Sequence, residues 1–204
     1  MNWIPWALRT AVAPVHVHAQ RMLLRMNRSR EQDGMTVYAD PKDGSFDLVF
    51  ERVAAARRLL DRVDPARARR VRAMLPNLLV TKVARSSGFW LATRTGLMER
   101  TILESRSDAY VAGILVFQAT FARLIGRGIA YTPRSQGRLV AACVREQAAF
   151  LDRLPREEYP GTDRNIEWLV EWAATGLRGP RPMWMRRVRP VRVFVRSLGP
   201  AAEA

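Results

Sequence analysis

Hydrophobic positions recur with a helical period along much of the chain. In FDLVFERVAAARRLLDRVD, which begins at Phe46, apolar residues return every three or four positions. Asp64 and Pro65 end this helix and begin another, because aspartate can cap a helix and proline is tolerated at its first position. The pattern therefore predicts two helices, joined at a corner, between Phe46 and Pro76.

The pattern changes between Pro76 and Asp108. The runs NLLVTKVA, FWLATRT and LMERTILES are rich in β-branched and aromatic residues, and Ser-Ser-Gly separates the first two as a turn. These runs predict a small antiparallel meander. Asp108 then caps an apolar helix that ends near Gly126 to Gly128, and helices are predicted over residues 134–154 and 163–176.

The two ends of the chain carry weaker patterns. Residues 1–45 are predicted to form a partly ordered N-terminal arm, with an amphipathic helix near Ala19–Met26. A core domain is predicted over residues 46–178 and a basic tail over residues 179–204. The predicted fold class is α+β, with a mostly helical domain and a small antiparallel sheet.

Composition favours one ordinary domain in a reducing compartment. The chain has 204 residues, of which 48% are hydrophobic, enough for a core that needs neither disulfide nor metal. Cys143 is the only cysteine, so an intrachain disulfide is excluded. The longest apolar run, Tyr110 to Gly126, contains Gln118 and Arg123 and is typical of a core helix. We expect a soluble cytoplasmic protein, with a peripheral membrane location as the alternative.

The net charge of +15 comes almost entirely from arginine, because Lys42 and Lys82 are the only lysines. An excess of arginine with alanine, valine and proline is what GC-rich coding produces, but a positive field attracts polyanions whatever its origin. The tail is the candidate polyanion-binding segment, through Arg186, Arg187, Arg189, Arg192 and Arg196. Its partner would be nucleic acid or an anionic membrane; a solvated arm that packs on a partner subunit is the simpler interpretation.

Few residues offer catalytic chemistry. No serine has the surroundings of a hydrolase nucleophile, and the chain has no glycine-rich phosphate loop. The two histidines, His16 and His18, lie in the predicted arm, where a strand would place both imidazoles on one side. No Cys, Asp or Glu follows them until Glu31, so a solvated pair is the simpler interpretation.

The stretch GILVFQATFARLIGRGIAY, Gly113 to Tyr131, has the spacing of a zinc-peptidase helix without its ligands. Such a helix carries two histidines at i and i+4, a glutamate base after the first, and a third ligand on a later helix. Here the i and i+4 positions are Phe117 and Phe121, and the base position is Gln118.

This run, continued by CVREQAAFLDRLP, resembles a poorly characterised bacterial family of zincin-like proteins. The family pattern is V-H-E-A-T-H-x-R-L, followed about two dozen residues later by C-V-R-x-E-x-A-F. The matching residues are Val116, Ala119, Thr120, Arg123, Leu124, Cys143, Val144, Arg145, Ala149 and Phe150. The resemblance extends from about Asp47 to Pro155, and before Asp108 it covers only the order of elements. It implies a zincin-like fold.

Every position that the resemblance implies for zinc chemistry has changed. Phe117 and Phe121 replace the two histidines, Gln118 replaces the base, and Gln147 replaces the glutamate of the later helix. Phenylalanine has no lone pair for a metal, and a neutral amide cannot deprotonate water. Glu146 does not restore the site, since one residue turns the side chain about 100° around the helix. We expect no metal, no cofactor and no catalytic residues.

Two interpretations of these phenylalanines remain: a former metal site rebuilt as packed core, or a core helix with no such history. In both, the rings are structural. The predicted function is that of an inactive metallopeptidase-like protein, a binding, scaffold or regulatory subunit whose partner is another protein. The alternatives are a basic adaptor for nucleic acid or an anionic membrane, and a zinc-dependent hydrolase with an unrecognised site.

Overall fold

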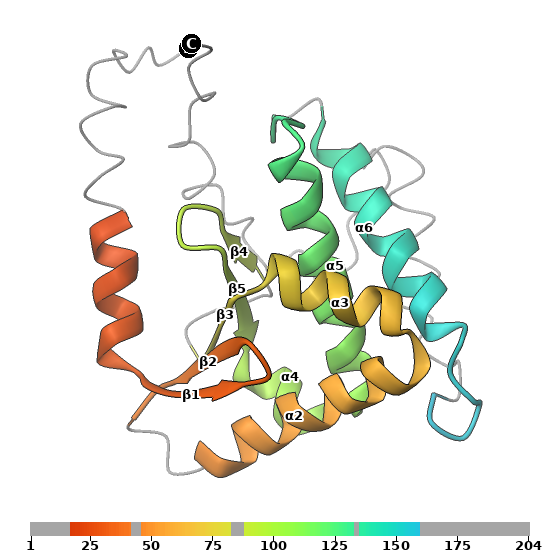
Figure 1. The fold of residues 1–204 in the computed structure, drawn as a ribbon, viewed down its shortest axis with the longest axis horizontal. Coiled ribbons are helices and arrows are strands. Elements are labelled where there is room, and N and C mark those ends of the chain that lie inside the picture. Colours follow the sequence, from red (N-terminus) through yellow and green to blue (C-terminus); the bar gives the residue numbers. More distant parts are fainter. Residues whose placement is uncertain (1–16, 42–45, 83–87, 133–134, 160–204) are drawn as a thin grey trace.

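The computed structural model describes residues 17–41, 46–82, 88–132 and 135–159. Figure 1 shows its elements, which follow the chain in this order: a helix over residues 17–26, β1 (Arg28–Gln32), β2 (Met35–Ala39), α2 (Phe46–Val63), α3 (Pro65–Met74), β3 (Asn77–Thr81), β4 (Gly88–Trp90), β5 (Thr95–Glu99), α4 (Arg100–Ser105), α5 (Asp108–Gly126) and α6 (Gln136–Leu151). The predicted helix over residues 163–176 and the basic tail lie outside the described residues.

The five strands form one mixed sheet in the order β1-β2-β3-β5-β4. The pairs β1–β2 and β4–β5 are antiparallel, whereas β2–β3 and β3–β5 are parallel. The α+β class is confirmed, but the expected antiparallel meander is not what forms. Helices α2 and α3 carry the chain back across the sheet between β2 and β3, and such a crossover makes the two strands parallel.

The region predicted as an arm contributes to this sheet. Its strands β1 and β2 are joined by Asp33 and Gly34, which have φ values of 46° and 80°. Two positive φ angles are those of a type I′ hairpin turn, for which Asp-Gly is a preferred pair. Arg57 of α2 is buried against this turn and donates to the carbonyl oxygens of Gln32 and Asp33. The boundary expected after residue 45 therefore separates two parts of one packed unit. The helix expected near Ala19–Met26 is present over residues 17–26.

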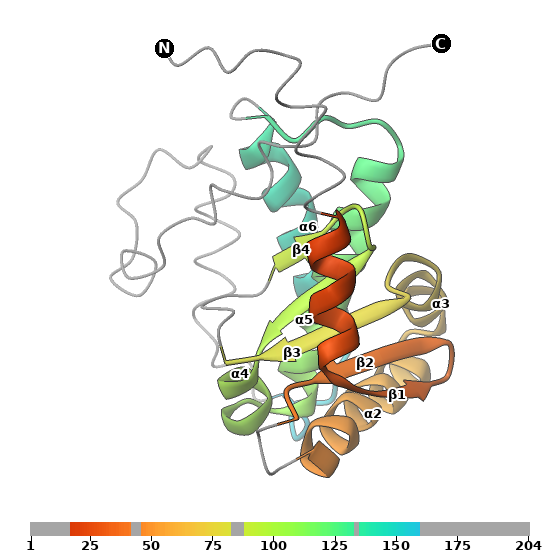
Figure 2. The same ribbon diagram turned by 90° about the vertical axis from the view of Figure 1, so that its left-hand side faces the viewer.

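The sheet lies between two helical layers. Figure 2 shows the helix over residues 17–26 on one face, with α2 and α5 on the other. The main core fills the space between the sheet and this second layer. Its fully buried side chains include Val37, Leu78 and Met98 from the strands, and Val53 and Leu115 from the helices.

The segment between β5 and α5 differs from its prediction. The run LMERTILES was expected to be a strand throughout, but β5 ends at Glu99 and α4 occupies Arg100–Ser105. Helix α5 then has Ser107 rather than Asp108 as its N-cap, and the Ser107 side chain accepts a hydrogen bond from the Tyr110 amide. Asp108 lies in the first turn, where a negative charge is favourable.

Among the described residues, α5 is the one helix long and apolar enough to cross a membrane, with 19 residues and a mean hydropathy of 1.5. In the most apolar window of α5, 56% of the residues are buried inside the fold. It packs against α2, α3 and α6. The helix is longer than the apolar run of the sequence suggested, and its burial is that of a core helix.

A network of ion pairs holds the α2–α3 corner against α6. The Asp64 side chain is 1% exposed; it accepts from the Arg67 amide at 3.0 Å, from the Arg67 guanidinium, and from Arg153 Nη1 at 2.7 Å. Arg67 and Arg70 also contact Glu146 of α6, at 3.1 and 2.9 Å. Burial raises the pKa of Asp64 and of Glu146, but the hydrogen bonds and positive charges of these arginines outweigh it. Both pKa values therefore lie below their ordinary values.

We predict that Asp64→Ala lowers the free energy of unfolding by about 2–3 kcal/mol at neutral pH, because it removes a helix cap and leaves Arg67 without this partner. Asp64→Asn should cost less, since the amide oxygen still accepts from the Arg67 backbone. Urea denaturation followed by circular dichroism measures both.

The stability that Asp64 contributes should depend on pH with a definite sign. A lowered folded-state pKa contributes stability above the unfolded-state value of about 3.9, and this is lost as the pH falls through the folded-state value. Wild-type protein should therefore lose stability more steeply than Asp64→Asn below about pH 4. Parallel stability curves for the two proteins would contradict this role of Asp64.

Candidate functional site

The four positions that replace the expected zinc ligands and base lie on two adjacent helices. Phe117, Gln118 and Phe121 are on α5, and Gln147 is on α6, which packs closely against α5. Gln118 and Gln147 are buried, with 1% and 5% of their surface exposed. Phe117 and Phe121 are only half-buried. The two phenylalanine rings are therefore partly accessible rather than fully enclosed, whereas both glutamines lie in the interior.

Gln118 is held against the sheet. Its Nε2 donates to the carbonyl oxygen of Leu97 on β5 at 2.7 Å. Its Oε1 is buried with no hydrogen-bond partner among the described residues. This approach depends on Gly96, because a Cβ at that position would lie closer than 3.0 Å to Gln118 Oε1. The missing side chain of Gly96 thus makes room for the amide of Gln118.

Phe121 belongs to a half-buried aromatic cluster at the edge of the sheet. Its ring makes edge contacts with Phe89 of β4 and with Tyr131, at centroid separations of 6.1 and 5.5 Å. Burial raises the pKa of Tyr131, which therefore stays protonated at neutral pH. Aromatic pairs of this kind add about 0.5–1.5 kcal/mol to the apolar burial. The Phe121 ring thus packs against β4 and against the segment that follows α5.

Gln147 of α6 lies across from Gly113 of α5. Gly113 is one helical turn before Phe117 on the same helix. A Cβ on Gly113 would be 3.3 Å from both Cγ and Nε2 of Gln147. The small residue allows α6 to approach α5 closely at this point. The structure therefore places Gln147 beside the same side of α5 that carries Phe117, which is where a ligand from the later helix would have to stand.

The neighbouring ionisable residues of α5 and α6 do not restore metal chemistry. Glu146 faces α3 and is engaged by Arg67 and Arg70, as its shifted helical position predicted. Cys143 is fully buried, and burial raises the pKa of its thiol to about 12, so it is a neutral apolar side chain at physiological pH. Arg123 has a buried Nε without a described partner, and burial lowers its pKa.

Within the described ranges, no three His, Cys, Asp or Glu side chains lie together in a way that could hold a metal ion. His18 is exposed on the helix over residues 17–26, so the strand arrangement considered for His16 and His18 does not form at His18. His16 and the five tail arginines, Arg186, Arg187, Arg189, Arg192 and Arg196, lie outside the described residues.

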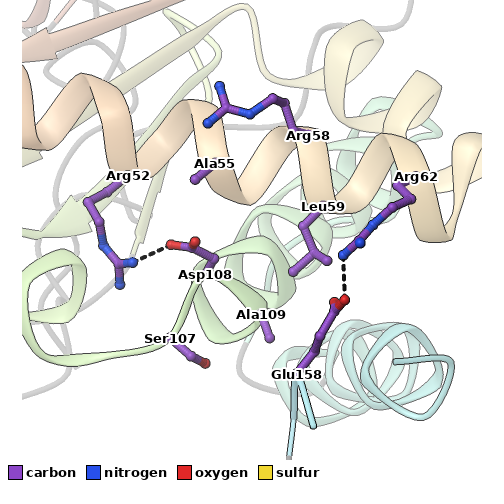
Figure 3. A pocket seen from close by; sticks show the side chains of 9 residues that line it. All are labelled: Arg52, Ala55, Arg58, Leu59, Arg62, Ser107, Asp108, Ala109 and Glu158. Atoms are coloured by element: carbon purple, nitrogen blue, oxygen red, sulfur yellow. Dashed lines mark hydrogen bonds and ion pairs between the residues drawn. The ribbon is translucent and has the colours of Figure 1, made fainter. Parts of the chain in front are cut away.

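A surface pocket of about 630 Å³ lies elsewhere, between α2 and the start of α5. Figure 3 shows that Arg52 points to Asp108 and Arg62 to Glu158, whereas Arg58 extends away from both carboxylates. This pocket could not be predicted from the sequence, because its walls come from residues far apart in the chain. Its two inward guanidinium groups are already paired with carboxylates, so it offers little net charge to a ligand.

No protein-family model, curated protein or solved structure matches the chain.

We predict that Gly96→Ala lowers the free energy of unfolding by about 1–3 kcal/mol, because the new methyl group displaces the buried Gln118 amide from Leu97. Gly88→Ala is the matched control on the neighbouring strand, where the nearest atom would be Leu97 Cδ1 at an ordinary 3.4 Å. Gly88→Ala should change stability much less.

The Gln118→Ala background tests whether the stability loss of Gly96→Ala comes from the clash with the Gln118 amide. There the added cost of Gly96→Ala should fall by more than half, because the clashing amide is absent. Thermal or urea unfolding of the four proteins of this cycle measures the coupling. An unchanged cost of Gly96→Ala in the Gln118→Ala background would contradict the packing described for these two residues.

Proposed function

We propose that this protein is a catalytically inactive, metallopeptidase-like protein that acts as a binding, scaffold or regulatory subunit for another protein. The observation that carries the proposal is the hydrogen bond from Gln118 Nε2 to the Leu97 carbonyl oxygen, at 2.7 Å in a buried position. The residue at the base position is a neutral donor fixed to the backbone of the sheet. It therefore holds the fold together where a catalytic base would have to face a metal-bound water.

The same bond explains why glutamine suits this position better than glutamate. A carboxylate at the position of the amide would bring two acceptor oxygens, its own and that of Leu97, into contact without a proton between them. It would also carry a buried charge, which costs several kcal/mol unless it is paired. The Leu97 carbonyl and the buried setting thus favour the loss of charge at residue 118.

The half-buried aromatic residues supply the surface for the proposed partner. Phe121, Phe89 and Tyr131 keep part of their surface accessible at the edge of the sheet, and Phe117 is partly accessible one helical turn before Phe121. Aromatic residues are enriched at protein interfaces, where they bury a large apolar area with little loss of side-chain entropy. A protein partner that covers these rings fits their chemistry, and we place this association in the cytoplasm.

The basic-adaptor alternative rests on the net charge of +15 and on the arginine-rich tail. The hydrolase alternative would need a metal site formed with residues beyond the described ranges. Zinc analysis of the purified protein and deletion of residues 179–204 separate these alternatives from the proposed function.

We predict that Gln118→Glu destabilises the protein at neutral pH, by roughly 2–4 kcal/mol. Burial beside the Leu97 carbonyl should raise the folded-state pKa of the new carboxyl. The sign of the pH effect follows: the protonated acid can still donate to Leu97, so the penalty is smallest at low pH and grows as the pH rises through the raised value.

Gln118→Met is the matched control, since it keeps a similar volume and removes the donor without adding a titratable group. The difference in unfolding free energy between Gln118→Met and wild type should not depend on pH, whereas that for Gln118→Glu should. A Gln118→Glu protein as stable as wild type at pH 7 would remove the main support for the proposal.

Metal content tests the inactive assignment directly. Protein purified without an affinity tag should contain far less than one zinc per chain, because phenylalanine and glutamine offer no suitable ligands at the four positions. Stoichiometric zinc, with an activity that a chelator removes, would instead support the zinc-dependent hydrolase.

The ancestry of the site has its own test. The combined variant Phe117→His, Gln118→Glu, Phe121→His and Gln147→Glu should gain about one zinc per chain, since it supplies two imidazoles at i and i+4 and a carboxylate from α6. A folded variant without zinc affinity would show that these four residues do not occupy a former metal site.

A further inference from the structure

The helix over residues 17–26 has a buried inner face and an exposed outer face that is apolar. Its inner face is formed by Gln20 and Leu24, which are 7% exposed each. Thr93 Oγ1 is 3.4 Å from Gln20 Oε1, which ties this helix to the loop between β4 and β5. Figures 1 and 2 agree that the helix stands on the face of the sheet opposite to α2 and α5.

The outer face is apolar. Met22, Leu23 and Met26 are 50%, 47% and 68% exposed, and they account for three of the five large hydrophobic residues exposed in the described part of the chain. Together with the exposed Ala19 they follow the spacing i, i+3, i+4 and i+7. At about 100° per residue these four side chains cover an arc of roughly 100°, on the side turned away from the buried face. We call this surface the apolar arc.

Arginine residues lie beside the apolar arc. Arg21 and Arg25 are exposed, and by helical geometry they occupy the sector between the apolar arc and the buried face. Arg28 and Arg30 follow at the start of β1 and stack on Phe46 and Phe50. From residue 17 to residue 30 the chain has no acidic residue. The exposed half of the helix is therefore divided into an apolar band and a positive band that run side by side.

We propose that this face of the helix docks on an anionic membrane surface. A helix with an adjacent apolar and arginine band lies in the plane of the interface, with its apolar side chains at the acyl boundary and its guanidinium groups at the lipid phosphates. Methionine and leucine gain from insertion into hydrocarbon, and each arginine near an anionic surface adds attraction. The surface thus has both the apolar and the charged component of interfacial binding.

Charge argues against the other occupants of this face. A second copy docked on the same face would bring Arg21 and Arg25 close to their own counterparts. The segment 179–204 carries the same sign of charge. Nucleic acid would satisfy the arginines, but the apolar arc contains no aromatic ring on which a base could stack. An anionic lipid surface is the partner that satisfies both bands.

Flotation of the full-length protein with vesicles tests the proposal. The protein should partition onto phosphatidylcholine vesicles that contain about 30% phosphatidylserine, and much less onto pure phosphatidylcholine. The combined variant Met22→Ser, Leu23→Ser and Met26→Ser should lower partitioning by at least about tenfold, and Arg21→Gln with Arg25→Gln by about fivefold for each arginine removed. Leu48→Ser, at a residue that is 42% exposed on α2, is the matched control and should bind like wild type.

Site-specific labelling gives a second readout that does not depend on affinity. Cys143 is fully buried with a raised pKa, so a cysteine introduced at the surface can be labelled selectively. An environment-sensitive fluorophore on Met26→Cys should shift to the blue when anionic vesicles are added, and the same fluorophore on Leu48→Cys should not. Equal shifts at both positions would overturn the proposed orientation.

The competing occupants give distinct results. Binding that survives the serine variant but disappears when residues 179–204 are removed would show that the tail binds the membrane, and would overturn the proposal. A self-association of wild-type protein that the serine variant abolishes, with vesicle partitioning unchanged, would assign the apolar arc to a second copy instead. Loss of affinity for single-stranded RNA in the arginine variant, with no binding to vesicles by wild type, would assign the positive band to nucleic acid.

Discussion

The hydrogen bond from Gln118 of α5 to the Leu97 carbonyl oxygen of β5 is the interaction that fixes the central helix to the sheet at the candidate site. Gln118 reaches the Leu97 carbonyl oxygen because Gly96 has no side chain at the point where the Gln118 amide lies. On the other side of α5, Gly113 allows α6 to approach with Gln147. Two glycines and two glutamines thus fix the central helix between the sheet and α6. A charged side chain at either glutamine would require a partner that these contacts do not supply.

The functional proposal follows from this packing more than from the motif itself. A helix with Phe at i and i+4 is common in protein cores, and the phenylalanines here are not even fully buried. What distinguishes the site is the buried, neutral amide of Gln118, bonded to the backbone of β5 at the position where the resemblance expects a base. The aromatic rings near it remain partly accessible, and the helix over residues 17–26 has a separate exposed surface with a different chemistry.

Much of the fold could be predicted because its signals are local. The apolar period from Phe46, the Asp64–Pro65 junction and the buried α5 helix all formed as expected. The parallel strand pairing could not be predicted, because short apolar runs do not specify which strand lies next to them. Arg100–Ser105 became a helix although its residues favour a strand, which shows how tertiary context overrides propensity. The Asp33-Gly34 pair is a hairpin signal in the sequence, but it does not indicate that β2 pairs with β3, and this region was predicted only as an arm.

The site was only partly predictable for a similar reason. Helical periodicity correctly predicted that Glu146 points away from the side of α6 that carries Gln147. The partial burial of Phe121 depends on its contacts with Phe89 of β4, which lies far from it in the chain, and with Tyr131. The ion-pair network around Asp64 and the pocket at Arg52 also join distant segments, so one sequence alone does not reveal them.

The measurement that tests the central claim most directly is nitrogen-15 NMR of the side-chain amide of Gln118, with and without zinc. The account predicts that the Nε2 protons exchange slowly with solvent, because the amide is buried and donates to Leu97, and that added zinc leaves their resonances unchanged. Rapid exchange, or a shift of these resonances on addition of zinc, would contradict it.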